Sequence, residues 1–225
     1  MSTSSGTDKL SPTRVFDFTA NYLPASQGGP PCLEVALPTG DLLALRMATP
    51  EDREELVRGF ERLSPSSRYT RFFTPMRSLS GPVLHQLADL SGYRHVAIAA
   101  FRTEGNRKGQ GVGVARAIQT NADAPAELAV TVVDEAQGNG LGELLLRVVV
   151  AVTLESGVDN FVASVLHDNG AAIRTFAKLG AHIRHDPDDP SISMVELRSS
   201  ELSLSSIWST QVQGEVRKFA VAVAV

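Results

Sequence analysis

The chain has a single cysteine, Cys32, which excludes an internal disulfide, and it lacks the paired Cys and His motifs of a structural zinc site. No apolar run approaches the length of about 20 residues that spans a bilayer, and residues 1–13 lack the hydrophobic core of a signal peptide. These absences predict a soluble, cytoplasmic protein with no membrane partner and no metal site.

Basic clusters are missing as well. Lys and Arg number 21 against 25 Asp and Glu, which gives a net charge of −4. Clustered positive charge is typical of dedicated nucleic-acid binders, so the composition argues against DNA or RNA as partners. What is present is apolar: 43% of the 225 residues are hydrophobic, which is enough for one buried core, and the chain is too short for two ordinary domains.

The two ends of the chain differ from its middle. Residues 1–13 are small and polar, so we expect a disordered tail there, and residues 14–41 form an N-terminal extension with one strand of a hairpin. In the C-terminal extension, residues 198–225, the stretch Phe219–Val225 alternates with the period of a strand and would aggregate if exposed. We therefore predict that it adds a strand to a sheet of this chain or of a second copy, as in a homodimer.

Between the extensions, residues 42–197 carry signals for both helices and strands. Thr49-Pro50, Ser64-Pro65 and Ser80-Gly81-Pro82 each place a cap residue before a proline and predict three short helices. Strands are predicted at residues 32–37, 42–47, 96–101, 112–118, 126–133, 161–166, 182–184 and 192–197, and further helices at 140–155 and 168–179. Antiparallel strands followed by a β-α-β-α unit predict a mixed α/β (α+β) fold.

The most informative segment is 126–142, AELAVTVVDEAQGNGLG, in which a strand leads through a glycine loop into a long amphipathic helix. Glycines allow a tight turn and a close approach to an anion, and the unpaired N–H groups of the first helical turn attract negative charge. The loop therefore predicts a phosphate cradle, and the alternative is a glycine turn that is merely tight. A Walker A loop needs lysine where Glu143 stands, and Gly140 and Gly142 are too close together for a dinucleotide fingerprint.

Residues Gln137-Gly138-Asn139-Gly140-Leu141-Gly142 resemble the Arg/Gln-x-x-Gly-x-Gly/Ala loop of the GNAT superfamily of N-acyltransferases. The segment 169–180 is similar to that family's Asn-x-x-Ala-Ile-x-x-Tyr-x-Lys-x-Gly helix, with Phe176 at the tyrosine position. Residues 62–72 are similar to the corresponding stretch of bacterial protein lysine acetyltransferases. The resemblance covers residues 42–197, a GNAT-like domain, and implies a central mixed, mostly antiparallel sheet flanked by helices.

The resemblance also implies a site that binds acetyl-CoA as co-substrate, without a metal. In the family, the loop amides hold the pyrophosphate and the preceding strand pairs with the pantetheine arm. Val132 matches the position whose N–H group meets the thioester carbonyl, and Asn169 matches a contact near the sulfur. The implied cofactor-binding residues are Val130, Thr131, Val132, Gln137, Gly138, Asn139, Gly140, Leu141, Gly142, Glu143 and Asn169.

Glu127 is the predicted catalytic base, because it matches the position at which the lysine acetyltransferases carry their catalytic glutamate. A substrate ammonium with a pKa near about 10.4 must lose a proton before its nitrogen attacks a thioester. The alternative interpretation of Glu127 is an exposed glutamate at the start of a strand. Phe176 cannot protonate the leaving thiolate as a tyrosine would, so either water serves or the step is absent.

We therefore predict an acetyl-CoA-dependent N-acetyltransferase in which an amine attacks the thioester directly. The acceptor is a protein lysine or, alternatively, a small-molecule amine, and residues 68–73 either line its channel or belong to core and surface. Two other classes stay open: an acyl-CoA-binding sensor that lacks catalysis, and an interaction domain with a tight glycine turn.

Overall fold

The computed structural model describes residues 18–26, 29–90, 94–202 and 210–224. The predicted disordered tail, residues 1–13, lies outside the described residues. The strands are β1 (Thr19–Leu23), β2 (Cys32–Ala36), β3 (Leu42–Met47), β4 (Arg94–Arg102), β5 (Gly111–Gln119), β6 (Ala126–Val132), β7 (Asn160–Leu166), β8 (His182–His185) and β9 (Ile192–Arg198). They form one nine-stranded sheet in the order β1-β2-β3-β4-β5-β6-β7-β9-β8.

Neighbouring strands of this sheet run antiparallel, except for β6 and β7, which are parallel. A parallel neighbour needs a crossover connection, and helix α4 (Leu141–Glu155) supplies it. The predicted mixed, mostly antiparallel sheet flanked by helices is confirmed, and each predicted strand from Cys32 to Leu197 is present. Strand β1, which the sequence pattern did not indicate, pairs with β2.

The helices α1 to α5 begin near the predicted signals, whereas α6 was not predicted. Besides α4, the described residues form α1 (Arg53–Glu61), α2 (Pro65–Phe72), α3 (Gly81–Ala88), α5 (Gly170–Lys178) and α6 (Thr210–Val223). A short 3-10 turn, Pro50–Asp52, precedes α1. The hydroxyl of Ser64 accepts the N–H of Ser67 at 3.1 Å and so caps α2.

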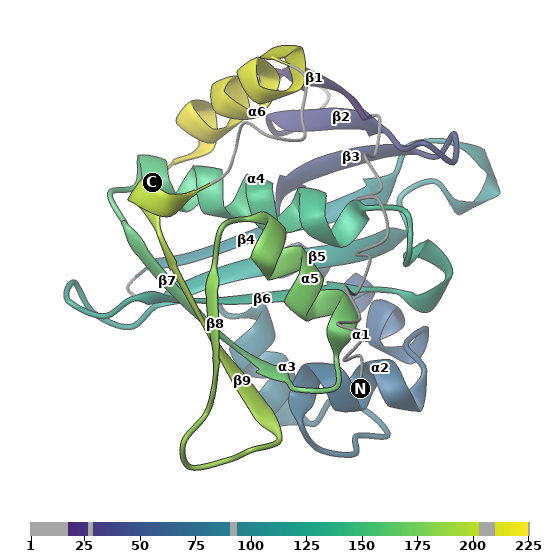
Figure 1. Cartoon of the computed structure of the whole chain (residues 1–225). Helices are drawn as coiled ribbons and strands as arrows, with labels where there is room; N and C mark the ends of the chain where they lie inside the picture. Colours follow the sequence, from purple (N-terminus) through teal and green to yellow (C-terminus); the bar gives the residue numbers. More distant parts are fainter. Residues whose placement is uncertain (1–17, 27–28, 91–93, 203–209, 225) are drawn as a thin grey trace, which may run out of the picture.

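The helices cover both faces of the sheet. Figure 1 shows α1, α2 and α3 on one side and α4, α5 and α6 on the other. Because successive strand residues face opposite sides, Leu128 of β6 packs in the core under α4, whereas Thr131 faces α1–α3. Helix α4 is apolar almost all round, and it lies between the sheet and the helices α5 and α6. None of the helices in the described ranges combines the length and the apolar character that a membrane crossing requires.

The predicted strand at Phe219–Val225 is wrong, because Phe219–Val223 belong to α6; Val225 lies outside the described residues. The buried residues of α6 recur at helical spacing: Val212, Val216, Phe219, Ala220 and Val223. A window of seven residues does not separate this period from simple alternation, and alanine is a strong helix former. The helix packs on α4 and β1, and Glu215 Oε2 accepts the N–H of Tyr22 at 2.8 Å. The apolar segment is therefore covered within this chain.

The substitution Val216→Ala is expected to lower the free energy of unfolding by about 2 kcal/mol, because it removes two methyl groups from a core position. Val216 is 4% exposed. Urea denaturation measures the effect, and Val221→Ala on the same helix is the control, because Val221 is 59% exposed and its truncation should change stability by less than about 0.5 kcal/mol. Equal effects of the two substitutions would contradict this packing of α6.

Candidate active site

The sheet opens between β6 and β7. These strands pair only at Ala126 with Phe161 and at Glu127 with Val162, although β6 continues to Val132. A cleft of about 980 Å³ lies beside the unpaired part of β6, which is large enough for an extended organic ligand. Its lining includes nine of the predicted cofactor-binding residues: Val130, Thr131, Val132, Gln137, Gly138, Gly140, Gly142, Glu143 and Asn169.

The open side of β6 presents backbone N–H groups. Val133 donates its N–H to the Val112 carbonyl of β5 at 3.0 Å, and successive N–H groups of a strand point in opposite directions. The N–H groups of Val132 and Val130 therefore point away from β5, toward the cleft. Gln137 Nε2 donates to the Val132 carbonyl at 2.9 Å, which ties the end of the strand to the glycine loop.

The glycine loop turns at two left-handed residues, Gly138 (φ 77°) and Gly140 (φ 87°), and Gly140 caps α4. The first N–H group to return to the Gly140 carbonyl is that of Leu144, at 3.0 Å. The amides of Gly142 and Glu143 therefore have no acceptor within the helix. Both residues line the cleft, where their amides and the helix dipole favour an anion.

Two residues of the predicted set, Asn139 and Leu141, lie outside the lining of the cleft. Asn139 Oδ1 accepts the N–H of Leu141 at 3.2 Å, so the Leu141 amide is already occupied. The side chain of Leu141 is buried in the core. These two residues hold the shape of the turn, and we assign them no direct contact with a ligand.

Helix α2 forms one wall of the cleft and is tied to the loop between β6 and α4. Asp134 accepts the N–H of Ser64 at 2.8 Å and the hydroxyl of Ser67 at 2.9 Å. Burial alone would raise the pKa of Asp134, but these hydrogen bonds outweigh it and hold the pKa below its ordinary value. Gln137 Nε2 also reaches the Ser67 hydroxyl, at 3.3 Å.

The first turns of α4 contain a buried ion pair that the sequence reading missed. Arg147 is fully buried, and its Nε donates to Glu143 Oε1 at 3.1 Å. Lys178 Nζ, from α5, lies 3.1 Å from the other carboxylate oxygen of Glu143, which is 5% exposed. The Glu143 side chain thus joins α4 to α5, and its negative charge is neutralised beside the cleft.

Helix α5 forms the opposite wall. Asn169 caps it, because its Oδ1 accepts the N–H of Ala172 at 3.1 Å, so its NH2 group is the part that remains to meet a ligand. Phe176 lines the cleft and is 3% exposed. The position of the GNAT tyrosine therefore carries a buried ring that has no proton to donate.

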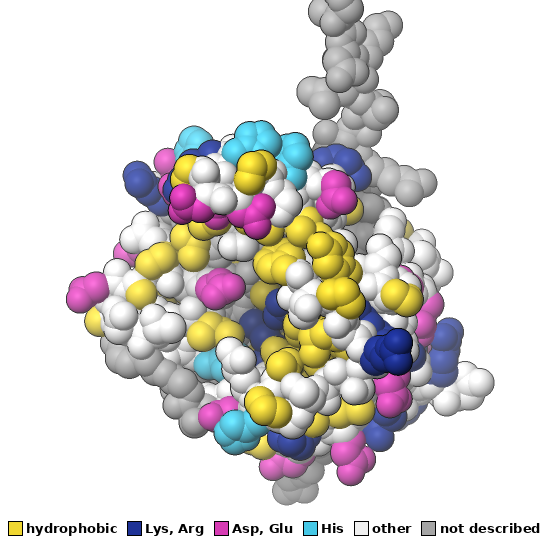
Figure 2. Space-filling view, turned by 90° about the horizontal axis from the view of Figure 1, so that it is seen from below, with side chains coloured by type: hydrophobic (Ala, Val, Ile, Leu, Met, Phe, Trp, Pro, Cys, Tyr) yellow, Lys and Arg dark blue, Asp and Glu magenta, His cyan; other side chains and the backbone are white. Residues whose placement is uncertain are grey.

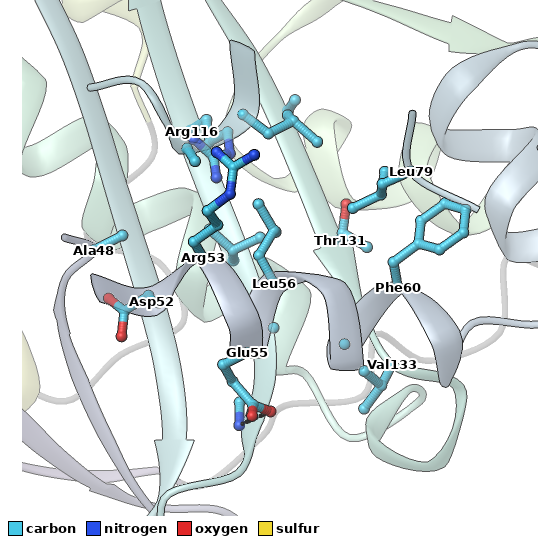
Figure 3. A pocket seen from close by; sticks show the side chains of 18 of the residues that line it. Ala48, Asp52, Arg53, Glu55, Leu56, Phe60, Leu79, Arg116, Thr131 and Val133 are labelled. Carbon is cyan, nitrogen blue, oxygen red and sulfur yellow. Dashed lines mark hydrogen bonds between the residues drawn. The ribbon is translucent and has the colours of Figure 1, made fainter. Parts of the chain in front are cut away.

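A smaller cavity lies on the other face of the sheet, under α1, α2 and α3. Its volume is about 100 Å³. Figure 3 shows Arg53, Leu56 and Phe60 projecting from α1 across the strands that carry Arg116 and Thr131. Most of its walls are apolar, so charged groups inside it are only weakly screened by water.

The cleft and the smaller cavity meet at Leu63, Arg71 and Thr131, which line both. Arg71 Nε donates to Thr131 Oγ1 at 3.1 Å. Of the segment 68–73, Arg71 and Phe72 line the smaller cavity, whereas Tyr69 and Phe73 are exposed. A ligand in the cleft and a molecule in the smaller cavity can therefore approach each other along this part of β6.

Glu127 lies on the same face of β6 as Thr131, four residues and about 13 Å away along the strand. Its side chain is exposed and, among the described residues, belongs to the lining of neither cavity. Burial lowers the pKa of Arg71, and the negative charge of Glu127 opposes that shift. The predicted base therefore stands at the edge of the site, close enough to influence Arg71.

Arg116 is a charged residue that the sequence reading did not single out. It is 4% exposed, lines the smaller cavity, and its guanidinium contacts His95 Nε2 at 3.0 Å. A guanidinium only donates, so Nε2 accepts and the ring is neutral. Burial is the main cause that lowers the pKa of Arg116 to about 10, and the charge of Arg71 adds to it. Burial also lowers the pKa of His95, and the charge of Arg116 adds to that shift. The only signal in the sequence is one arginine inside the apolar run 112–118.

Comparisons with known proteins identify the family. Residues 43–182 match the model of the acetyltransferase (GNAT) domain. Over 154 residues, the chain is 30% identical to the acetyltransferase PA5475 of Pseudomonas aeruginosa. This match covers 68% of this chain and 82% of that protein. Over 150 residues, it is 31% identical to the acetyltransferase Pat of Mycolicibacterium smegmatis. This match covers 66% of this chain and 44% of Pat.

A solved structure agrees with these sequence matches. The GNAT domain of S. lividans PAT has 30% sequence identity and a TM-score of 0.66, over 74% of this chain and 96% of that domain. The cleft between β6 and β7, the glycine loop and these matches point the same way. The chain therefore belongs to the acetyltransferase (GNAT) family and is an N-acetyltransferase.

Proposed function

We propose that this N-acetyltransferase uses acetyl-CoA and transfers its acetyl group to a primary amine. The observation that carries the proposal is the separation of β6 from β7, which leads the open edge of β6 directly to the glycine loop at the start of α4. One strand edge and one helix end thus offer amides to a long ligand that carries a pyrophosphate.

The residues of the cleft fit such a ligand. A Cβ added at Gly138 would meet no atom within 4 Å, so no protein atom occupies the space beside the loop. The free amides of Gly142 and Glu143 and the positively charged Arg174 all line the same cleft. The donors therefore match the negative charge of a pyrophosphate.

Bound acetyl-CoA supplies a thioester whose carbonyl carbon an amine can attack. The Val132 N–H, which points into the cleft, donates to the carbonyl oxygen as negative charge develops on it. Glu127 accepts a proton from the ammonium through water, because it lies several residues along β6 from Val132, and the ammonium pKa near about 10.4 otherwise keeps the nitrogen protonated. The nitrogen–carbon bond forms as the carbon–sulfur bond breaks, and the second proton that leaves the nitrogen reaches the thiolate through water, because Phe176 has none to give.

Two acceptor classes fit this chemistry. The similarity of residues 62–72 to bacterial protein lysine acetyltransferases supports a protein lysine. The small volume of the smaller cavity, about 100 Å³, supports a small-molecule amine. A sensor that binds acetyl-CoA without acetyl transfer would use the same cleft. Phe176, which has no proton to donate to the thiolate, favours this alternative. The release of free CoA thiol in the presence of an amine separates the sensor from the enzyme.

Gly140→Asp is expected to abolish the stabilisation of the protein by acetyl-CoA. At a ligand concentration 100-fold above Kd, mass action should raise the wild-type unfolding midpoint by roughly 5 to 10 °C. Aspartate at this position has an unfavourable φ of 87° and adds a negative charge to the anion site. Thermal unfolding with and without acetyl-CoA measures both proteins.

Gly40→Asp is the matched control. Gly40 has a φ of 88°, and a Cβ added there would meet nothing within 4 Å, so the substitution causes the same backbone strain and charge change in the turn before β3. This variant should keep the full shift with acetyl-CoA. An absent shift in the wild type, or equal shifts in both variants, would rule out the cleft as the acetyl-CoA site.

A further inference from the structure

Three arginines line the smaller cavity, and besides the exposed Arg53 they are Arg71 and Arg116, which form no ion pair with a carboxylate among the described residues. Arg116 contacts a neutral histidine, and Arg71 donates to the hydroxyl of Thr131. In the part of the chain that the structure describes, neither guanidinium lies within 4 Å of a carboxylate oxygen. Arg116 is 4% exposed, and a buried cation without an anionic partner is unfavourable, so its position requires an explanation.

The acids that line the cavity are neutralised by other groups. Asp52 accepts two hydrogen bonds from Arg46, at 2.6 and 2.8 Å. Glu55 accepts from Arg58 Nε at 2.7 Å and from the Gly111 N–H at 2.9 Å. Their charges are therefore already balanced, and the cavity keeps an excess of positive charge.

The positive charge is accessible from outside. Figure 2 shows Lys or Arg atoms recessed in a hollow that hydrophobic side chains surround, with an acidic side chain beside it. Arg71 lines both cavities, and Arg116 lines only the smaller one. An anion held by Arg116 therefore lies apart from the glycine loop and cannot be the pyrophosphate.

We infer that the acceptor amine carries a carboxylate, which Arg71 and Arg116 bind in the smaller cavity while the amine lies where this cavity meets the cleft, at Thr131. The inference rests on the proposed acetyl transfer and narrows its acceptor to a short aminocarboxylate. Arg116 pairs with Ala129, which is two residues, or about 7 Å along the strand, from Thr131 on the same face of β6. A four-carbon chain with an amine and a carboxylate at its ends spans that distance, and a guanidinium binds a carboxylate through two parallel hydrogen bonds.

Matched acceptors with and without the carboxylate test this inference. The pairs are 4-aminobutyrate with 1-aminobutane, and Nα-acetyl-lysine with its carboxamide, and the readout is kcat/KM for the release of free CoA thiol. The wild type should prefer the carboxylate member by roughly 10- to 100-fold, the value of a charge-assisted contact. Arg116→Gln should reduce the preference to less than about threefold and leave the affinity for acetyl-CoA unchanged.

The control is Arg198→Gln, which makes the same charge change at an exposed position of β9 outside both cavities and should keep the preference. Because Arg116 is a buried cation without a carboxylate partner, Arg116→Gln should unfold at a temperature no lower than that of the wild type. Thermal unfolding therefore shows that a lost preference does not come from misfolding.

Calorimetric titration of 4-aminobutyrate and 1-aminobutane into the protein without acetyl-CoA separates the two proposals. Selective binding of the carboxylate member, together with no binding of acetyl-CoA, would overturn the proposed function and support the anion site. Binding of acetyl-CoA, together with equal kcat/KM for charged and neutral acceptors, would overturn the inference and favour a protein lysine. A preference that Arg116→Gln leaves intact would also overturn it.

Discussion

Glu127→Gln is expected to lower kcat for acetyl transfer by roughly 100- to 10,000-fold at neutral pH, the usual contribution of a general base. Glutamine has the same size but cannot take a proton from the ammonium. Because Glu127 is exposed and lies outside the lining of the cleft, acetyl-CoA binding should be unchanged. Initial rates of thiol release, with thermal shifts by acetyl-CoA, measure the two effects.

The pH dependence gives an internal check on this result. As the pH approaches about 10, more of the amine loses its proton without a base, so the variant should regain activity relative to the wild type. Glu34→Gln, at an exposed position of β2, is the control and should leave the rate within about twofold. A rate for Glu127→Gln close to that of Glu34→Gln would show that Glu127 is only an exposed glutamate.

Glu143→Gln is expected to lower the free energy of unfolding by about 3 to 5 kcal/mol, because it leaves Arg147 fully buried without a counter-charge. For a chain of this size, that corresponds to a drop of roughly 6 to 20 °C in the unfolding midpoint. Lys178, which also contacts the Glu143 carboxylate, would then add a second positive charge to the same place. Urea and thermal denaturation measure the change.

The matched control is Glu54→Gln. Glu54 forms the same i,i+4 pair with Arg58 at 3.4 Å, but its side chain is 85% exposed, so its loss should change stability by less than about 0.5 kcal/mol. The double substitution Glu143→Leu/Arg147→Met should recover most of the lost stability, because no unpaired charge is left in the core. Similar small effects of Glu143→Gln and Glu54→Gln would show that burial adds nothing to this ion pair.

Local patterns were sufficient to predict β6, the glycine loop and α4. The apolar residues of α4 keep helical spacing over 15 residues, and the left-handed turn before the helix requires glycine. The prediction for the C-terminal segment was wrong for the opposite reason. Phe219–Val225 is too short to establish a period, and Val212 and Val216, which reveal the helix, lie outside that window.

The resemblance indicated Glu127 and residues 68–73, but the arrangement of the acceptor side could not be predicted, because its charged residues come from separate segments. Arg71 belongs to α2, Arg116 to β5 and Glu127 to β6. No spacing along the chain links an arginine on a helix to an arginine on a strand, and only the packing of α1–α3 on the sheet brings both to one cavity. The i,i+4 spacing of Glu143 and Arg147 was visible in the sequence. Their burial was not visible, because it depends on the packing of α5.

The short contact between β6 and β7 also affects how the molecule can move. Since only two residue pairs join these strands, the sheet consists of two parts, β1–β6 and β7–β9, that are joined by a short contact at Ala126 and Glu127. A ligand that pairs with the open edge of β6 replaces the missing hydrogen bonds and links the two parts. Binding of such a ligand would therefore change how firmly the two parts of the sheet are connected.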